Sequence, residues 1–320
     1  MLHSMPSLIT ASSDSGSSVL MFPQTSELSE FMRLSPIPRY GNRGPEWIVR
    51  VRRWKMFYGR TRVIVCSDYY DLGRRAAHDV AMLMREMLKI VPELRIIFAA
   101  AESQMTFLDA LAAEPDVDWR RVVCFDMDEF WGPDLPETAT CAWQLRRQLY
   151  DRVLPAAWHA PRWNAPDPFR EAAEFAAVFR KHRPIHILCQ GIGRSGHLAL
   201  NEPGAASFSD THIARVVDVC GESTRQLHDD PNFREAANLL KKGITLTIPA
   251  LMSATHKFTI VPLASKTPVL EKLFTMQTPS EKLPASIIRN YPGRLYVDAD
   301  SCPESLRGRH RMQPVRHAGA

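Results

Sequence analysis

The sequence predicts an α/β protein: a doubly wound, mostly parallel sheet with helices on both faces, in three Rossmann-like layers. Two observations lead to this prediction. Short apolar runs alternate with segments whose apolar residues recur at helical spacing, a pattern typical of β-α-β units. The 320 residues, of which 45% are hydrophobic, are also enough to bury one large core or two modest ones.

The strand–helix units begin near residue 61. The run TRVIVCS at 61–67 is rich in β-branched residues, and 68–91 has apolar residues at helical spacing with Asp68 as the N-cap. Further strands are expected at 93–101, 121–130, 184–190, 257–265 and 294–299, and further helices at 102–114 and 142–154. Ligands of parallel sheets bind beyond the carboxyl ends of the strands, so the functional site is expected there. Those ends fall just after residues 101, 128, 190 and 265.

Three flanking segments lie outside this pattern. Residues 1–38 are rich in Ser, punctuated by Pro and without periodicity, which predicts a largely disordered extension. Residues 39–60 form a basic and aromatic arm, and residues 304–320 form a basic tail. The folded domain is therefore expected at 61–303.

The net charge of +5 is concentrated in the flanks, because residues 39–62 hold eight Arg or Lys against one Glu. Cations interleaved with aromatic side chains can bind nucleic acid. The simpler interpretation is an extra strand whose aromatic side chains cover the body. No signature of a nucleic-acid-binding module accompanies the arm, so nucleic acid is not the predicted partner.

Cysteine usage and hydropathy indicate the compartment. The six cysteines are far apart and include no C-x-x-C pair, which predicts buried thiols in a reducing compartment and neither a disulfide framework nor a metal site. The first 32 residues hold no Lys or Arg and no sustained apolar run, which argues against a secretory signal. No stretch is long enough to span a membrane, so a cytoplasmic protein is expected.

The stretch GIGRSGHLALNEPG at 191–204 raises the question of a dinucleotide cofactor. Gly191, Gly193 and Gly196 have G-x-G-x-x-G spacing and follow the strand-like run PIHILCQ. A dinucleotide turn needs a long helix that starts at the third glycine, and Pro203 would break such a helix. The sequence therefore predicts no dinucleotide, but a glycine-lined turn that carries His197 and Glu202.

Polar groups at several strand ends are candidates for chemistry. Histidine can both give and take a proton near neutral pH, and Glu202 could orient His197, although such a pair is often only structural. In FDMDEF, an extended chain would point Asp126 and Asp128 to the same side and Glu129 to the other. Two close carboxylates raise one pKa, which suits a base; the alternative is a hydrated strand end with a capping aspartate.

Two further strand ends carry groups that could bind an anion. Lys266, in PLASKTP, opens a helix-like segment, where an ammonium and free backbone N–H groups would hold a phosphate. Ser103, in AAAESQ, lies at another helix start. An exposed, solvated lysine is an equally good interpretation of Lys266 taken alone.

Together these motifs resemble the glucosamine-6-phosphate deaminase/isomerase family, which also includes the 6-phosphogluconolactonases. FDMDEFWG at 125–132 is similar to that family's M-D-E-Y-hydrophobic-G motif, and GIGRSGHLALNEP at 191–203 to its G-x-G-x-D-G-H-I-A-F-N-E-P signature. ITLTIPALMSA at 244–254 and ASK at 264–266 fall where later family elements do. The resemblance covers roughly 61–300, and GHLALNEP is closer to the deaminase version.

The resemblance implies the chemistry of an amino-sugar-phosphate deaminase. Asp128 would move a proton between C2 and C1 of the opened sugar, and His197, oriented by Glu202, would open the ring. Ser103, Gly191, Gly193 and Lys266 would bind the substrate and its phosphate, with Arg225 the nearest counterpart of a phosphate-binding arginine. The partner would be a small sugar phosphate, with no organic cofactor and no metal, and a homo-oligomer is compatible with the family.

Three departures from the family pattern leave alternatives open. Ser195 replaces the aspartate two positions before the histidine, AAAESQ has no glycine and gains an acid, and Arg225 sits near an apparent insertion. One alternative is a sugar-phosphate sensor with weakened catalysis. Another is a 6-phosphogluconolactonase-type hydrolase that uses His197, a chemistry with no evident need for Asp128.

Overall fold

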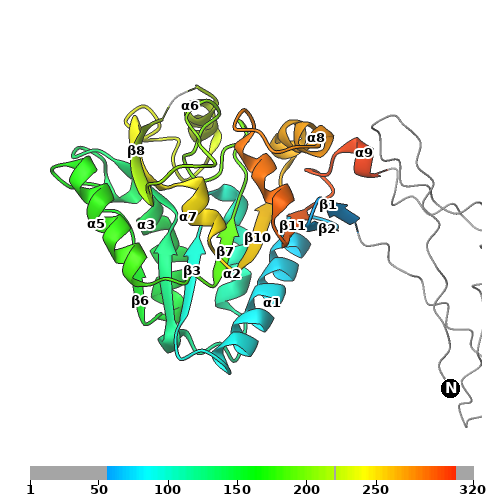
Figure 1. Cartoon of the computed structure of the whole chain (residues 1–320), viewed down its shortest axis with the longest axis horizontal. Helices are drawn as coiled ribbons and strands as arrows, with labels where there is room; N and C mark the ends of the chain where they lie inside the picture. The colour runs from blue at the N-terminus through cyan, green and yellow to red at the C-terminus, as the bar shows by residue number, and fades with distance from the viewer. Residues whose placement is uncertain (1–55, 220, 308–320) are drawn as a thin grey trace, which may run out of the picture. The chain divides into compact units, whose positions relative to one another are not determined.

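The computed structural model describes residues 56–219 and 221–307 (Figure 1). Over these residues the main sheet has eight strands, in the order β1-β2-β11-β10-β7-β3-β4-β6. Every neighbouring pair is parallel except β1 and β2. Its strands are β1 (Met56–Tyr58), β2 (Thr61–Val65), β3 (Leu94–Phe98), β4 (Val122–Asp126), β6 (Ala157–His159), β7 (Ile187–Gln190), β10 (His256–Val261) and β11 (Gly293–Val297).

Helices cover both faces of this sheet, which confirms the predicted fold class. One face packs against α1 (Tyr69–Leu88), α2 (Met105–Ala112) and the π-helical η4 (Arg146–Tyr150). The other packs against α5 (Pro168–Lys181), α7 (Ile248–Met252) and α8 (Thr267–Thr275). The remaining helical segments are η1 (Glu102–Gln104), η2 (Trp119–Arg121), η3 (Glu137–Ala139), α3 (Cys141–Leu145), α4 (Asp151–Val153), α6 (Gly221–Asp229), η5 (Ala264–Lys266), η6 (Pro284–Asn290) and α9 (Glu304–Arg307).

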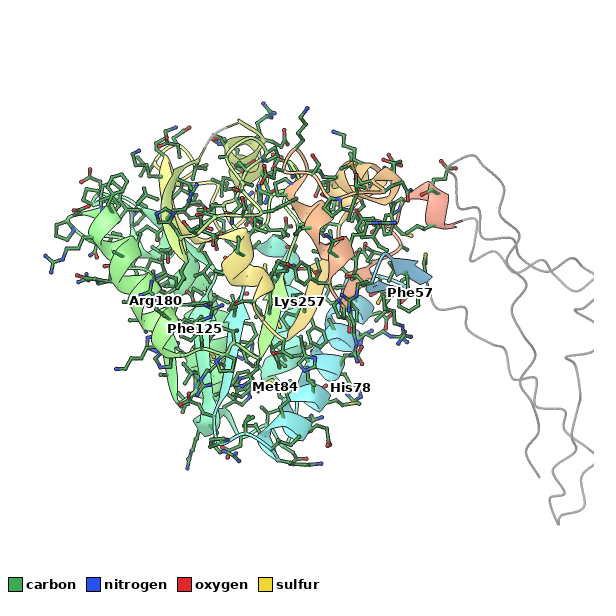
Figure 2. The ribbon with its side chains drawn as sticks, viewed as in Figure 1. Phe57, His78, Met84, Phe125, Arg180 and Lys257 are labelled. Atoms are coloured by element: carbon green, nitrogen blue, oxygen red, sulfur yellow. The ribbon has the colours of Figure 1, made fainter. Side chains whose placement is uncertain are left out.

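The alternation of side chains along the strands divides the core between the two faces. In β3, Ile96 and Phe98 belong to the cluster under α1, whereas Ile97 belongs to the cluster under α5. Met84 of α1 and Phe125 of β4, both labelled in Figure 2, belong to these two clusters. Strands buried on both faces read as continuous apolar runs, which is why the sequence revealed them.

Local signals placed the helix starts. Asp68 caps α1 as expected, with its carboxylate accepting from the backbone N–H of Asp71, 2.8 Å away. Asp167 caps α5 in the same way, and Pro168 occupies the first turn. Helix α5 and strands β6 and β8 were not among the expected elements.

A second, small sheet is the main difference from the prediction. It consists of β5 (Asp128–Trp131), β9 (Lys242–Leu246) and β8 (Ala214–Asp218), all antiparallel. The expected strand at 121–130 is divided by a bend at Met127, and its second half leaves the main sheet. The apolar run continues through the bend, so hydropathy alone could not reveal the break.

The basic arm at 39–60 is described only from Met56. Residues 56–58 form the edge strand β1, with Phe57 half exposed (Figure 2) and Tyr58 buried, so the folded domain begins before residue 61. The rest of the arm, the extension at 1–38, Cys220 and the tail beyond residue 307 lie outside the described residues. The other five cysteines are buried, and no helix among the described residues is long and apolar enough to cross a membrane.

Candidate active site

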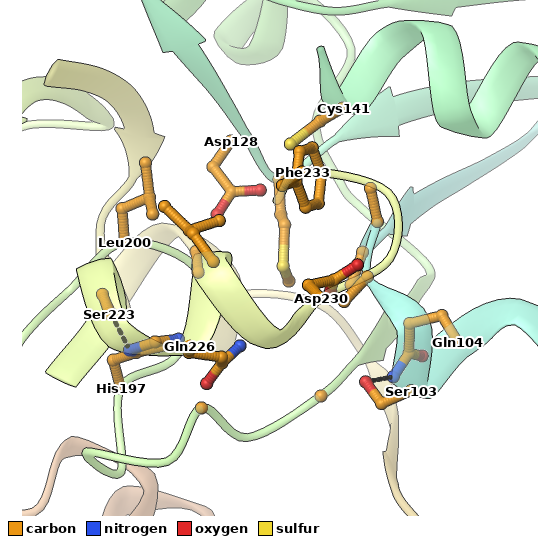
Figure 3. A pocket seen from close by; sticks show the side chains of 18 of the residues that line it. Ser103, Gln104, Asp128, Cys141, His197, Leu200, Ser223, Gln226, Asp230 and Phe233 are labelled. Atoms are coloured by element: carbon orange, nitrogen blue, oxygen red, sulfur yellow. Dashed lines mark hydrogen bonds between the residues drawn. The ribbon is translucent and has the colours of Figure 1, made fainter. Parts of the chain in front are cut away.

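A pocket opens at the carboxyl edge of the main sheet, where the sequence placed it (Figure 3). Its empty space, including the open mouth, is about 680 Å³. Residues after β3, β4 and β7, Lys266 of η5, and α6 with the loop after it contribute to the walls. Six of the predicted site residues line it: Ser103, Asp128, Gly191, Gly193, His197 and Lys266.

His197 is held through one ring nitrogen. Its Nδ1 lies 2.6 Å from Glu202 Oε1, 3.0 Å from Ser195 Oγ and 2.9 Å from Ser223 Oγ. The Ser223 hydroxyl donates to Glu202 Oε1, so its own oxygen is free to accept from Nδ1–H. This arrangement favours the tautomer with the proton on Nδ1 and leaves Nε2 for the substrate.

Glu202 does not line the pocket, but its carboxylate brings a negative charge to the side chains around Nδ1 of His197. Burial would raise the pKa of its carboxyl, but the hydrogen bond and charge of His197, with bonds from Ser223 and Ser195, lower the pKa overall. Glu202 is therefore the anion that partners His197, while Ser195 supplies only a neutral hydroxyl beside it. Ser223 was not among the predicted site residues, because a lone serine some 26 positions away carries no local signal.

The glycine-lined turn is explained by the imidazole and not by a cofactor. A Cβ on Gly193 would lie 1.9 Å from His197 Nε2, so only glycine leaves room for the ring. A Cβ on Gly191 would lie 3.0 Å from Gln104 Nε2. Gly196, with φ of +90°, turns the chain so that His197 faces back over Gly193.

Asp128 enters the pocket from the opposite side, at the start of β5, as Figure 3 shows. It is 8% exposed, and burial raises the pKa of its carboxyl to about 7. A carboxylate with a pKa near neutrality is a stronger base than an exposed one and is still ionised in part.

The expectation that Asp126 shares this space with Asp128 is wrong, because the chain bends at Met127. Asp126 ends β4, lies outside the pocket lining, and accepts a hydrogen bond from the Tyr150 hydroxyl, 2.8 Å away. Glu129 is also removed from the pocket: its carboxylate accepts from the backbone N–H groups of Cys141 and Ala142 and so caps α3. Of these three carboxylates, Asp128 alone lines the pocket.

The buried Asp126 carboxyl predicts a pH-dependent stability difference. Burial, opposed by the Tyr150 hydrogen bond and aided by the charge of Asp128, raises its pKa to about 8, above the roughly 3.9 of an unfolded Asp. Between these two pKa values the native state keeps a proton that the unfolded state loses. The free energy of unfolding therefore falls as the pH rises from about 4 to about 8. We expect Asp126→Asn to melt at least about 4 °C higher than wild type at pH 8.5, with a much smaller difference at pH 5. Thermal unfolding at both pH values measures this, and an equal difference at the two would contradict it.

Lys266 lies at the other end of the pocket. Its side chain is 5% exposed, and its Nζ donates to Gln226 Oε1, 3.3 Å away. Burial, and then the charge of Arg194, lower the pKa of the ammonium to about 8, although Asp230 and Glu102 oppose the shift. The interpretation of Lys266 as an exposed surface lysine is therefore wrong.

Arg225 is not brought to the pocket. Its guanidinium points away on α6, mostly exposed, and pairs with Glu222 at 2.6 Å. Arg194 lies nearer, beside Lys266, and pairs with Asp229. Within the described residues no group of three or more His, Cys, Asp or Glu side chains is arranged to hold a metal ion.

Comparison with known proteins gives matches over most of the chain. The family model described as glucosamine-6-phosphate isomerases/6-phosphogluconolactonase matches residues 67–297. A glucosamine-6-phosphate deaminase of Mycoplasmopsis pulmonis is 23% identical over 240 residues, which cover 73% of this chain and 91% of the relative. The same enzyme of an Exiguobacterium species is 28% identical over 206 residues, covering 62% and 78%.

Solved structures share the fold. A monomeric glucosamine-6-phosphate deaminase superimposes with a TM-score of 0.65 at 23% identity, covering 75% of this chain and 98% of that one. A 6-phosphogluconolactonase from Thermotoga maritima gives a TM-score of 0.59 at 17% identity, covering 74% and 98%. At these identities the likeness establishes the architecture alone.

Proposed function

The chain belongs to the family of glucosamine-6-phosphate isomerases and 6-phosphogluconolactonases, and from this premise we propose that it is a deaminating aldose–ketose isomerase of amino sugars. Glucosamine 6-phosphate, which the names of its relatives give, is the reference substrate. The observation that carries the proposal is that Asp128 and the Glu202-bound His197 line one pocket.

In this proposal His197 opens the sugar ring. Its free Nε2 takes the proton of the C1 hydroxyl as the C1–O5 bond breaks, and the resulting imidazolium returns a proton to O5. Glu202 stabilises the imidazolium through Nδ1, as a buried carboxylate does for a catalytic histidine.

Asp128 then carries the isomerisation. Its carboxylate takes the proton from C2 of the open aldehyde, and the electrons form a C1–C2 double bond. The negative charge that develops on O1 takes a proton from the substrate's own ammonium group at C2. Asp128 returns its proton to C1, which leaves a C=N bond at C2. Water adds to that carbon, the C–N bond breaks, and a ketose and ammonia leave. A base with a pKa of about 7 can both accept and return the proton.

The proposal is tested with a panel of amino sugars, each with and without phosphate, in which ammonia and ketose are measured together. Stoichiometric release of both supports the proposal. Phosphosugar binding in calorimetry without turnover would indicate a sensor instead. Hydrolysis of 6-phosphogluconolactone that needs His197 but not Asp128 would indicate a lactonase.

Ser223 is proposed to position His197 in this reaction. Replacing it with alanine removes one acceptor from Nδ1 and one donor to Glu202, so we expect kcat to fall about tenfold. The acid limb of the kcat/KM profile is set by the proton that Asp128 must lose, with a pKa of about 7, so that limb should stay near pH 7 while kcat falls.

The control for Ser223→Ala is Ser209→Ala, which removes an exposed hydroxyl bonded only to Ser207 in the described structure. It should leave both rate and profile unchanged. A kcat in Ser223→Ala within about twofold of wild type would show that Ser223 does not position His197.

A further inference from the structure

We propose that the Lys266 end of the pocket is built for an uncharged, hydroxyl-bearing group, so that an amino sugar without phosphate is preferred over its 6-phosphate. This inference rests on the proposed deaminating isomerisation and concerns which sugars undergo it. Its subject is the space between Lys266, Glu102 and Asp230, which lies beside the loop after β3.

The first observation is that the Asp230 carboxylate already binds the backbone N–H at the start of η1, a donor that a phosphate would otherwise use. The backbone N–H of Glu102, at the start of η1, donates to Asp230 Oδ2 at 3.1 Å. The other oxygen, Oδ1, accepts from the backbone and side-chain nitrogens of Asn232, both at 2.9 Å. Asp230 is 5% exposed, and these three donors hold its carboxylate in place. A phosphate seeking the donor at the start of η1 would have to displace it.

The second observation is the balance of charge around this space. Two acids, Glu102 and Asp230, and two bases, Arg194 and Lys266, line it together. Arg194 is already paired with Asp229. Lys266, by contrast, has no carboxylate within 4.0 Å among the described residues, so its ammonium is the positive charge left to attract an anion. One ammonium against two carboxylates does not offer a dianion a favourable site.

The charge of Asp230 also acts on Glu102. Burial, followed by the charge of Asp230, raises the pKa of the Glu102 carboxyl. A bound phosphate would add two further negative charges near these acids and would oppose the ionisation of Glu102. Like charges brought close in a partly buried site repel one another and weaken binding of the anion.

A hydroxyl group suits the same side chains. Its oxygen can accept from the Lys266 ammonium, and its hydrogen can go to Glu102 or Asp230. A phosphate ester offers acceptors alone, so it could satisfy Lys266 but neither carboxylate. The end of the pocket thus matches the free hydroxymethyl group of an unphosphorylated sugar better than a phosphorylated one.

The test compares glucosamine with glucosamine 6-phosphate by ammonia release. We expect kcat/KM to be at least about tenfold higher for glucosamine. Asp230→Asn keeps the shape and removes the charge, so it should shift the ratio of the two kcat/KM values at least about tenfold toward the phosphate. Glu102→Gln should shift it in the same direction and serves if Asp230→Asn does not fold.

The matched control is Glu222→Gln, which removes an acid of α6 that pairs with Arg225 outside the pocket. Its selectivity should equal that of wild type. Preference for glucosamine 6-phosphate in wild type, with a ratio that Asp230→Asn and Glu102→Gln leave unchanged, would overturn this inference and leave the proposed function standing. Ammonia from neither sugar would overturn the proposed function and this inference with it.

Discussion

Asp128→Asn is expected to lower ammonia release by about 10³-fold or more at saturating substrate. The amide is nearly the same shape as the carboxylate but cannot take the C2 proton, and positioned bases contribute roughly 10²- to 10⁴-fold. Because the acid is buried without an ion pair within 4.0 Å among the described residues, its loss should not destabilise the fold. KM should change little, since ring opening and binding do not use this group.

The matched control for Asp128→Asn is Asp126→Asn. Asp126 stands two positions earlier, is fully buried and is bonded to Tyr150 outside the pocket. It should keep turnover within about threefold of wild type, because it does not reach substrate. If Asp128→Asn retained more than about a tenth of the activity, Asp128 would not be the base.

The main sheet and the place of the pocket could be predicted because their signals are local. Runs such as TRVIVCS are strands by their own composition, and a parallel sheet then places its ligands at one edge. Asp128, His197 and Lys266 follow three different strand ends, so sheet topology alone brings them to one side. This is why residues nearly 140 positions apart could be assigned to a common site from sequence.

What the sequence did not reveal depends on packing between distant segments. The bend at Met127 separates Asp126 from Asp128, and it is stabilised by pairing of β5 with β9, more than a hundred residues later. Ser223 and Asp230 reach the pocket because of where α6 and the loop after it pack, and neither has a motif of its own. Arg225 was favoured as an arginine in the right region, but helical phase turns it outward on α6.

The departure at Ser195 is partly compensated in the structure. An aspartate at position 195 would have placed a negative charge beside Nδ1 of His197. Here the charged partner is Glu202, whose Oε1 lies 2.6 Å from Nδ1, against 3.0 Å for Ser195 Oγ. Ser195 and Ser223 then act as two neutral neighbours of the same nitrogen. This arrangement supports an enzyme over a sensor that has lost its catalytic histidine partner.

Gly193→Ala is expected to lower turnover by about 10²-fold while the fold is retained. A Cβ at this position would lie 1.9 Å from His197 Nε2, 2.1 Å from Cε1 and 2.3 Å from Cδ2, so the whole ring must move. A displacement of about 1 Å at a reacting group can cost 10²-fold, and here it also loosens the bonds of Nδ1 to Glu202 and Ser223. Gly193 is not among the glycines of positive φ, so the added methyl group acts on the ring and not through backbone strain.

Gly204→Ala separates the effect of backbone strain from that of a clash with the imidazole. Gly204 has a φ of +87° and nothing within 4 Å of an added Cβ, so alanine there strains the backbone without touching the imidazole. It should lower the melting temperature by a few degrees, for a cost of about 1 kcal/mol, and leave turnover near that of wild type. Gly193→Ala should show the opposite combination, a large loss of kcat with a small change in melting temperature. If Gly193→Ala kept more than about a third of wild-type turnover, the position of the His197 ring over this glycine would not matter for catalysis.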